Sequence, residues 1–577
     1  MIIRSLSFII AVFLFTNVEG QEKYLTPFEL DSNHTATYEE MISFYSLLAD
    51  NSPLVHVKEL GRTDIGRPLH LVIVSNARTP DPISEREIGK AIVLVNNAIH
   101  PGEPCGVDAS MMLVRDFVAG KIDESELDKY TLLVIPAFNI GGMLNRNSYS
   151  RANQMGPESY GFRGNAQNLD LNRDFMKSDS KNARALQGIF ASWRPHVFVD
   201  THTTNGADYP YVMTLIATQK NQLGGPMAQF MRDEMVPTLY DKMKEGPYPM
   251  CPYVFYRDSI EAGLMDFNDS PRYSTGFAAL QHSMGFVTEA HMLKPFSDRV
   301  MSTWWFLRHL LEYTHDHSTA IVETQKAQLD HYLKQNEMAI KWSLDTTRAE
   351  SFLFYGYTRK GKPSLWSGGM RSYYDQEDNY EKIIPYYTDY VAEEKVVIPE
   401  YYILPQAYDD LIEKFDDNGV YYEKLMRDTV IEGKFYRIES VETSKTAYEG
   451  HFWHPEVEVS TIQTKRQYYE GDLVIPTRQW NIRFIVNALE PHAADSWLVW
   501  NFFDGILMQK EHFSSYVFED RAYELLQENP ELKSQLEEAR QNDKELMESP
   551  YKQLQFIYTN SPHYENTHRL YPVGRFF

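Results

Sequence analysis

The chain has 577 residues, which is room for two to four domains at about 150 residues each. An apolar fraction of 43% and an aromatic fraction of 14% exclude a disordered chain, and only two cysteines exclude a disulfide-rich scaffold. The 80 acidic residues outnumber the 56 basic residues, and the net charge of -24 argues against binding to nucleic acid.

The N-terminus carries a basic residue, Arg4, followed by a short apolar run and a small-residue site ending at Gly20. This pattern predicts a secretory signal peptide over residues 1–20, with a mature chain that begins near Gln21 and is secreted or periplasmic. The apolar run is shorter than the roughly 20 residues that cross a bilayer, so no membrane span is expected. A buried N-terminal segment is the alternative.

Between about residue 37 and residue 315, short apolar runs alternate with segments of helical periodicity. Apolar runs without alternation are typical of strands buried on both faces, as in a parallel sheet. The alternation predicts a doubly wound α/β sheet, whose ligands bind beyond the carboxyl ends of the strands. The predicted strands are 91–95, 131–138, 195–202 and 285–291, and the predicted helices are 106–119, 183–193, 225–244 and 297–313.

One segment of this region, residues 139–169, is a polar stretch rich in Asn, Gly, Ser and Arg. A structureless loop of that length inside a compact domain is usually functional or disordered. Its three arginines, Arg146, Arg151 and Arg163, favour a function.

After about residue 320 the composition changes, and we expect an accessory α+β region over residues 321–577, divisible into two subdomains. The expected elements are a polar helix (321–341), Tyr-rich β structure (352–390), a strand and a helix (400–415), a strand (420–425), an antiparallel sheet (435–472) and a charged helix (530–548). The two cysteines, Cys105 and Cys251, are expected to be buried thiols, with a single bridge as the alternative.

Polar side chains with metal-binding chemistry follow two of the predicted strands. His100 and Glu103 come after the strand that ends near Val95, and His202 lies at the end of the strand that contains Asp200. Two imidazoles and one carboxylate make a three-ligand zinc site with an open position for water. Asp200 is a candidate to hold the second nitrogen of a ligand histidine, although it can equally cap the strand.

A third element places Glu289 near the end of another apolar strand, where a carboxylate is costly to bury without a task. Beside a metal-activated water it is a candidate general base, and an ion pair with Lys294 is the alternative. Asn172 and Arg173 offer planar donors suited to a carboxylate, and their alternative is a salt bridge from Arg173 to Asp170 or Asp174. Each motif alone is weak, whereas their order along the chain is informative.

The order of these motifs resembles that of zinc carboxypeptidases of the carboxypeptidase A type. The resemblance covers roughly residues 37–315, and the C-terminal half is similar to the extension of some large secreted bacterial members. It implies a mixed, mostly parallel sheet flanked by helices, within a catalytic domain over residues 21–320.

The resemblance also implies roles for individual residues. His100, Glu103 and His202 would bind one Zn²⁺ ion per chain, and Glu289 would be the general base. Asn172 and Arg173 would clamp the C-terminal carboxylate of the substrate, while Arg151 would polarise the scissile carbonyl and stabilise the oxyanion.

Several positions depart from the family pattern. Gly102 stands where pancreatic members have an arginine, and 98 residues separate Glu103 from His202, which is short for digestive members. Tyr273 is the best candidate for the family's mobile tyrosine, and Arg272 beside it is a candidate second contact to the carboxylate. The family's specificity-determining residue at the floor of the substrate pocket cannot be aligned with a position in this sequence.

These features predict a secreted zinc carboxypeptidase that acts on peptides or proteins with a free C-terminal carboxylate. A zinc amidase acting on cell-wall peptides or acylated amino acids would use the same metal chemistry with a different pocket. A third hypothesis is a non-catalytic surface binding protein with a decayed peptidase domain. The presence of all three candidate ligands and of the candidate base argues against it.

Overall fold

The structure is a computed structural model that describes residues 24–577. The predicted signal peptide, residues 1–20, lies outside the described residues. Within residues 24–577, no helix combines the length and the apolar character needed to cross a membrane.

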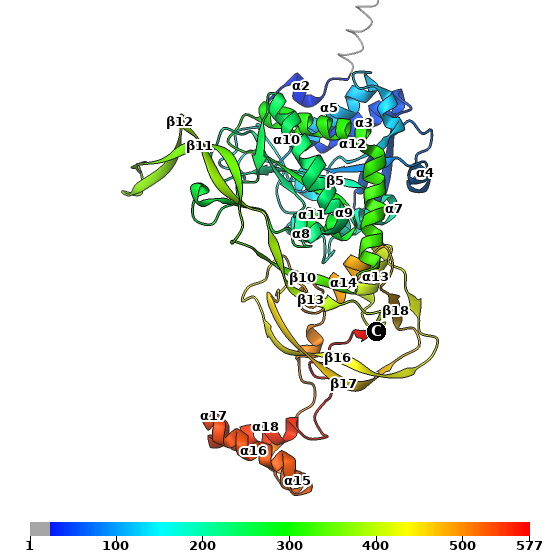
Figure 1. Ribbon diagram of the computed structural model, residues 1–577, viewed down its shortest axis with the longest axis vertical. Coiled ribbons are helices and arrows are strands. Elements are labelled where there is room, and N and C mark those ends of the chain that lie inside the picture. Colours follow the sequence, from blue (N-terminus) through cyan, green and yellow to red (C-terminus); the bar gives the residue numbers. More distant parts are fainter. Residues whose placement is uncertain (1–23) are drawn as a thin grey trace, which may run out of the picture.

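The N-terminal half is built on one eight-stranded sheet, seen edge-on behind its helices in Figure 1. Its four central strands are parallel, and antiparallel neighbours flank them, so the predicted mixed, mostly parallel α/β fold is confirmed. In spatial order the strands are β1 (Val55–Arg62), β2 (Pro68–Val74), β4 (Tyr130–Ile135), β3 (Ala91–Asn96), β5 (Val197–Thr204), β9 (Met284–His291), β6 (Met213–Ala217) and β7 (Met250–Pro252).

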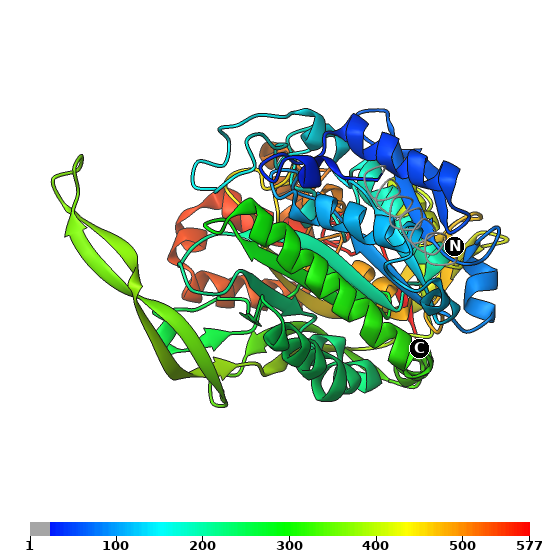
Figure 2. The ribbon, with the colours of Figure 1, turned by 90° about the horizontal axis from the view of Figure 1, so that it is seen from above.

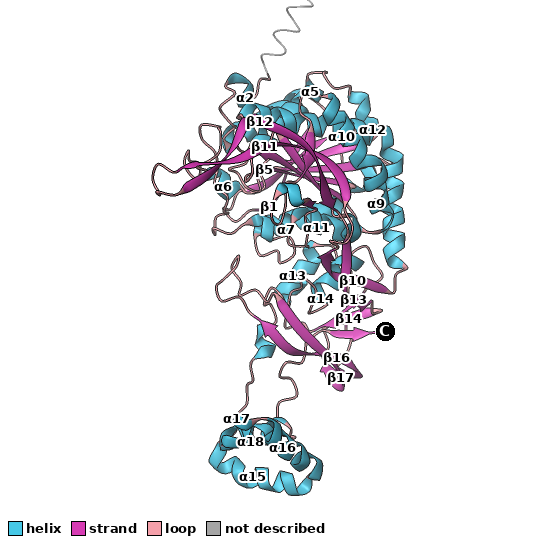
Figure 3. Cartoon of the chain, turned by 60° about the vertical axis from the view of Figure 1, so that its left-hand side comes forward, coloured by secondary structure: helices cyan, strands magenta, loops and turns pink. Residues whose placement is uncertain are grey.

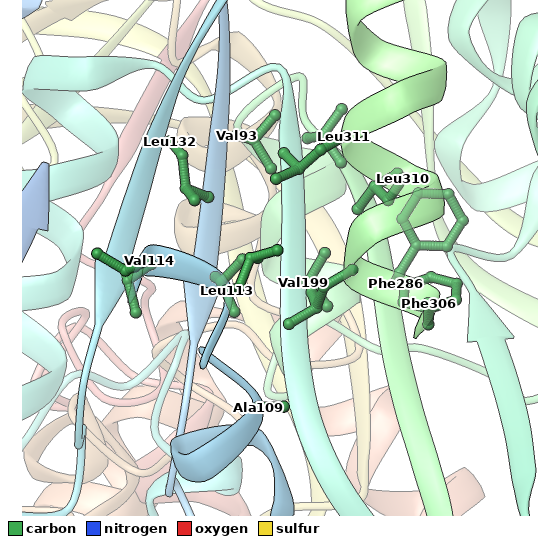
Figure 4. Close-up of a cluster of buried hydrophobic side chains, with 14 of the residues drawn as sticks. Val93, Ala109, Leu113, Val114, Leu132, Val199, Phe286, Phe306, Leu310 and Leu311 are labelled. Atoms are coloured by element: carbon green, nitrogen blue, oxygen red, sulfur yellow. The ribbon is translucent and has the colours of Figure 1, made fainter. Parts of the chain in front are cut away.

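Both faces of the central strands are buried, because successive side chains of a strand point to opposite faces. Val93 and Val199 project to the face covered by α5 (Cys105–Val118) and α12 (Phe296–Leu333), as Figure 4 shows. Their neighbours pack on the opposite face against α7 (Lys181–Trp193) and α11 (Ser274–Leu280). This two-sided burial explains why the strands have continuous apolar sequences.

The predicted helix 225–244 is interrupted by a π-helical turn at Met231–Met235, between α9 (Gly225–Phe230) and α10 (Val236–Glu245). The predicted helix 297–313 continues for another 20 residues to the end of α12 at Leu333. Shorter helices surround the sheet: α2 (Pro27–Leu30), α3 (Tyr38–Asn51), α4 (Pro82–Glu87), α6 (Ile140–Leu144) and α8 (Lys220–Leu223).

Two helix predictions in the C-terminal half were wrong at their ends. The polar helix expected over 321–341 is the last part of α12, and the chain then forms β10 (Glu337–Leu344), which pairs with β13 (Tyr390–Val397). The charged helix expected over 530–548 is two helices, α16 (Pro530–Asn542) and α17 (Lys544–Glu548), because Asp543 between them caps the second helix.

The Tyr-rich segment forms a long hairpin of β11 (Glu350–Pro363) and β12 (Met370–Tyr387) that projects from the body (Figure 2). β12 also pairs with β8 (Leu264–Met265). The remaining strands are β16 (Thr429–Glu442) and β17 (Glu456–Tyr468), which pair with each other, and a four-stranded sheet of β15 (Glu423–Lys424), β18 (Leu473–Pro476), β14 (Tyr401–Leu404) and β19 (Gly574–Phe576). Helices α15 (Ser515–Glu528), α16, α17 and α18 (Pro550–Thr559) form a separate cluster at one end of the molecule (Figure 3).

The two halves of the chain share one hydrophobic core beneath α7 and α11. Trp497 is fully buried and contacts the rings of Phe415 and Phe484, and Phe484 in turn contacts Phe277 of α11. The indole nitrogen of Trp497 also donates to the carbonyl of Met176. Since the expected domain boundary at residue 320 falls inside α12, we expect both halves to unfold cooperatively.

Replacing Trp497 with Ala tests this shared core. The substitution should lower the free energy of unfolding by about 3–5 kcal/mol, because it leaves a large cavity among aromatic rings. Chemical denaturation of the full chain measures the change. Trp366→Ala is the matched control, because Trp366 is 96% exposed at the hairpin tip and its loss should change stability by less than about 0.5 kcal/mol. Equal stability of the two variants would contradict the shared core.

Candidate active site

The candidate site lies at the carboxyl ends of three adjacent parallel strands, β3, β5 and β9. In the sheet register Asn96 at the end of β3 is opposite Asp200 of β5, and His202 of β5 is opposite Glu289 of β9. The loop between β3 and α5 carries His100 and Glu103 to the same edge. The sheet therefore brings together side chains that are about 190 residues apart in sequence.

A glycine at the start of α5 allows this helix to pack closely against β5. At Gly106, a β-carbon would lie only 2.0 Å from the side-chain oxygen of Thr201 and 2.6 Å from that of Asn97. No larger residue fits without displacing β5. Because Thr201 precedes His202, the glycine fixes the separation between the first pair of candidate ligands and the third.

His100, Glu103 and His202 form a buried cluster whose candidate ligand atoms all lie within 4.8 Å of one another. The Glu103 carboxylate lies 3.3 Å from Nδ1 of His100 and 3.1 Å from Nδ1 of His202. Nδ1 of His100 is buried and has no hydrogen-bond partner, which is costly for a polar atom unless a ligand occupies it. Two imidazole nitrogens and a carboxylate are a donor set that fits zinc.

A carboxylate holds the second nitrogen of each histidine. Nε2 of His100 lies 2.8 Å from Asp170, and Nε2 of His202 lies 3.0 Å from Asp200, so Nδ1 of each ring is directed to the cluster. Burial raises the pKa of Asp170, but His100, Arg163 and Arg173 outweigh it and hold that pKa well below its usual range. Asp170 is therefore ionised at neutral pH and orients His100.

The polar loop 139–169 supplies two arginines to the cavity. Arg151 donates to Glu103 at 2.9 Å and to the carbonyl of Thr203 at 3.3 Å. Arg163 pairs with Asp170 at 2.8 Å and lies 3.6 Å from Glu103. The third arginine, Arg146, instead donates to Ser159 and to backbone carbonyls outside the cavity, so its role is structural.

The predicted carboxylate clamp lies in a short 3-10 turn, Leu171–Arg173. Asn172 has a buried side-chain oxygen without a hydrogen-bond partner. The Arg173 guanidinium stacks 4.6 Å above the ring of Tyr273, donates to the hydroxyl of Tyr448 at 3.1 Å, and comes within 3.8 Å of Asp170. The weak contact with Asp170 leaves Arg173 with donors free for a ligand.

Glu289 faces the same cavity, which has a volume of about 550 Å³ and is also lined by the three candidate ligands, both clamp residues, Arg151 and Tyr273. The alternative partner, Lys294, is paired with Asp208 at 2.8 Å. Burial raises the pKa of Glu289 to about 8, although His202 opposes the shift. A carboxylate with a raised pKa is suited to exchange protons near neutral pH.

Two sequence expectations concern residues near this cavity. Arg272 is not a second contact to the cavity, because it pairs with buried Asp495 at 2.8 Å and stacks on Trp453 at 4.6 Å. Cys105 and Cys251 are both buried and free, as expected.

The sequence did not single out several residues that the structure adds to the site. Asp170 was considered only as a partner of Arg173, whereas it holds His100. Tyr448 and Glu449 come from the C-terminal half, and Glu449 accepts from the backbone N–H of Asp170 at 2.7 Å. Asp269 lines the cavity from the loop after β8. Of these residues, only Asp170 could have been found from the sequence, because it lies two residues before Asn172.

Comparisons with known proteins agree with this geometry. A sequence model of the family described as "Zinc carboxypeptidase" matches residues 41–203, a range that contains the three candidate ligands and the clamp. Residues 41–203 are therefore similar to the zinc carboxypeptidase family.

Similar proteins align with this chain beyond the matched range. Carboxypeptidase 2 of Trichophyton rubrum is 21% identical over 484 residues, covering 79% of this chain and 82% of the relative. Probable carboxypeptidase 2 of Arthroderma benhamiae is also 21% identical, with coverage of 79% and 84%. Among solved structures, a metallo-carboxypeptidase from Burkholderia cenocepacia aligns with a TM-score of 0.35 and 18% identity, covering 52% of this chain and 70% of that one.

Replacing Asp170 with Asn tests the contact between Asp170 and Nε2 of His100, one of the candidate zinc ligands. Loss of the charge that orients His100 should weaken zinc binding by about 10–100-fold, as measured by competition with a chelator of known affinity. Asp64→Asn is the control, because Asp64 bonds to Asn165 and to the backbone of Lys181 without touching the cluster. Unchanged zinc affinity in Asp170→Asn would show that this contact does not tune the site.

Proposed function

We propose that this protein is an exported carboxypeptidase that removes the C-terminal residue of peptides or proteins, using one zinc ion per chain. The observation that carries the proposal is the convergence of His100, Glu103, His202 and Glu289 with Arg173 in one cavity. The basic and apolar N-terminal segment supports a secreted or periplasmic location. We assign catalysis to residues 21–320 and an accessory role to residues 321–577.

The proposed metal ligands are His100, Glu103 and His202. A zinc ion in this site supplies Lewis acidity, which lowers the pKa of water toward about 7. Asp170 and Asp200 hold the two imidazoles through their outer nitrogens, so that neither ring must reorient when it binds the metal.

Substrate binding is assigned to the clamp. Arg173 receives the terminal carboxylate through its guanidinium donors, and the side chain of Asn172 adds a further donor. Tyr273, which stacks on Arg173, closes the side of the cavity over the terminal residue. Recognition of a free carboxylate makes the enzyme an exopeptidase.

Proton transfer is assigned to Glu289. Its carboxylate accepts a proton from the attacking water and returns it to the nitrogen of the leaving amino acid. The Arg151 guanidinium donates to the scissile carbonyl oxygen as that oxygen gains negative charge. Together these two residues account for the acid–base and electrostatic parts of the reaction.

The Glu289→Gln variant tests the base. It should keep about one zinc per chain by elemental analysis, while kcat falls by about 10²–10⁴-fold, because the amide cannot accept the proton. Glu261→Gln, an exposed glutamate, is the control and should keep full activity. An active Glu289→Gln enzyme would overturn the assignment of the base.

The Arg173→Ala variant distinguishes a carboxypeptidase from an amidase. For a peptide with a free carboxylate, kcat/KM should fall by about 10²–10³-fold, because a buried charge pair is lost. The C-terminal amide of the same peptide should be a poor substrate that is indifferent to the change. Arg359→Ala, at an exposed arginine of the hairpin, is the control. Equal losses on acid and amide would favour the zinc amidase.

A further inference from the structure

The hairpin of β11 and β12 carries large apolar side chains at its tip, away from the body of the protein (Figure 2). Trp366 is 96% exposed, Leu365 is 86% exposed and Met370 is 70% exposed. A backbone hydrogen bond of 2.7 Å from Ser364 to the carbonyl of Gly369 closes the loop that carries them. Single exposed apolar residues are common, whereas several gathered at one point indicate an interaction surface.

The base of the hairpin is fixed to the catalytic half of the chain. Phe354 of β11 is fully buried in an aromatic cluster, where its ring contacts that of Tyr209. Gln376 of β12 donates to the carboxylate of Asp208 at 2.8 Å. From Phe354 to Pro363, β11 extends roughly 30 Å at about 3.3 Å per residue. The protein therefore holds the tip at a fixed place, well clear of its body.

Basic side chains stand directly behind the apolar tip, although the whole chain has a net charge of -24. Residues 359–373 contain no acidic residue and four basic ones, Arg359, Lys360, Lys362 and Arg371. In the register of the hairpin, Lys362 is opposite Arg371. Like charges at directly opposite positions destabilise a pair of strands. The tip therefore gathers positive charge at a cost to the hairpin itself.

Most of this positive charge lacks a partner within the protein. Lys360 pairs with Asp375 at 2.9 Å and with Asp378 at 2.7 Å. Among residues 24–577, no carboxylate forms an ion pair with the other three basic residues of the tip. Lys362 instead lies over the ring of Tyr373, 4.3 Å from its centroid. The opposed cations are thus available to an external anion.

The order of side chains along the hairpin indicates the kind of partner. The apolar residues lie at the extreme end, and the unpaired basic residues follow on both strands behind them. A bilayer of anionic lipids requires this order, because its phosphates lie outside its apolar interior. Tryptophan favours the boundary between the two, and Lys and Arg side chains reach back to the phosphates. A protein partner imposes no such order in depth.

We propose that the hairpin tip inserts into the surface of a membrane that contains anionic phospholipids. Leu365, Trp366 and Met370 enter the boundary between headgroups and acyl chains, while Lys362 and Arg371 bind lipid phosphates. The repulsion between the two opposed cations is thereby relieved. The inference adds a place of action to the proposed function and does not depend on the catalytic assignments.

Sedimentation with vesicles tests the proposal. The protein is the zinc-loaded chain beginning at Gln21, because the apolar run before that residue would itself bind vesicles. It should bind vesicles of phosphatidylglycerol and phosphatidylcholine in equal parts at least about tenfold more tightly than vesicles of phosphatidylcholine alone. Raising NaCl from about 0.1 M to about 0.5 M should weaken binding, since exposed charges are screened. Equal binding to both vesicles, or binding to neither, would overturn the proposal.

Variants of the tip locate the binding. Trp366→Ala should weaken binding to the mixed vesicles by about tenfold, because the buried apolar area is lost. The double variant Lys362→Gln and Arg371→Gln should weaken it by about 20–30-fold, or about fivefold for each charge removed. All of these variants should hydrolyse a dissolved peptide at the rate of the unmodified enzyme, since the tip does not line the catalytic cavity. Full vesicle binding by either variant would refute the role of the tip.

Matched controls remove the same chemistry from the helical cluster at the other end of the molecule. Tyr516→Ala removes an aromatic side chain of α15 that is 85% exposed. Lys533→Gln with Lys544→Gln removes two positive charges from α16 and α17. Both controls should bind the mixed vesicles as tightly as the unmodified protein. Losses equal to those of the tip variants would show that overall charge or apolarity, and not the hairpin, decides binding.

A fluorescent label at the tip distinguishes a bilayer from other partners. Because Cys105 and Cys251 are buried, the variant Ser367→Cys accepts an environment-sensitive fluorophore at the tip alone. Its emission should shift to the blue with the mixed vesicles and stay unchanged with heparin, an anionic polysaccharide. An equal shift with heparin, or sedimentation with vesicles without a shift, would contradict insertion. A dimer in sedimentation velocity that Trp366→Ala dissociates, with vesicle binding unchanged, would identify a second copy as the partner instead.

Discussion

The buried carboxylate of Glu103 is the interaction on which the site depends. One of its oxygens is bonded to Arg151 at 2.9 Å and lies 3.3 Å from His100, and the other is bonded to His202 at 3.1 Å and to the backbone N–H of Thr203 at 2.8 Å. A buried negative charge requires positive partners, and these converge on Glu103 from the β3–α5 loop, β5 and the polar loop. A divalent cation at this point would contact Glu103 and the two imidazoles beside it, those of His100 and His202.

The C-terminal half contacts the proposed carboxylate clamp of the same site. Tyr448 accepts from Arg173, and Glu449 accepts from the backbone of Asp170, across 275 and 279 residues of sequence. The Tyr448 ring stacks on Trp500, whose side chain is fully buried. The C-terminal half therefore supports Arg173 through Tyr448, which is itself packed on a buried aromatic ring.

The parts of the fold that could be predicted are those with strong local patterns. β3, β5 and β9 were predictable because both of their faces are buried, and the candidate ligands were predictable because they lie at or just after the carboxyl ends of β3 and β5. The end of α12 was not predicted because its last turns are polar and no glycine or proline marks Leu333. Tyr448 could not be predicted as a site residue, since it acquires its significance from Arg173, which is 275 residues away in sequence.

The most direct measurement of the central claim is anomalous diffraction at the zinc edge from crystals of the zinc-loaded protein. We predict one peak per chain, about 2.0–2.2 Å from Nδ1 of His100, a carboxylate oxygen of Glu103 and Nδ1 of His202. A peak elsewhere in the chain, or a zinc ion bound through Nε2 of either histidine, would contradict it.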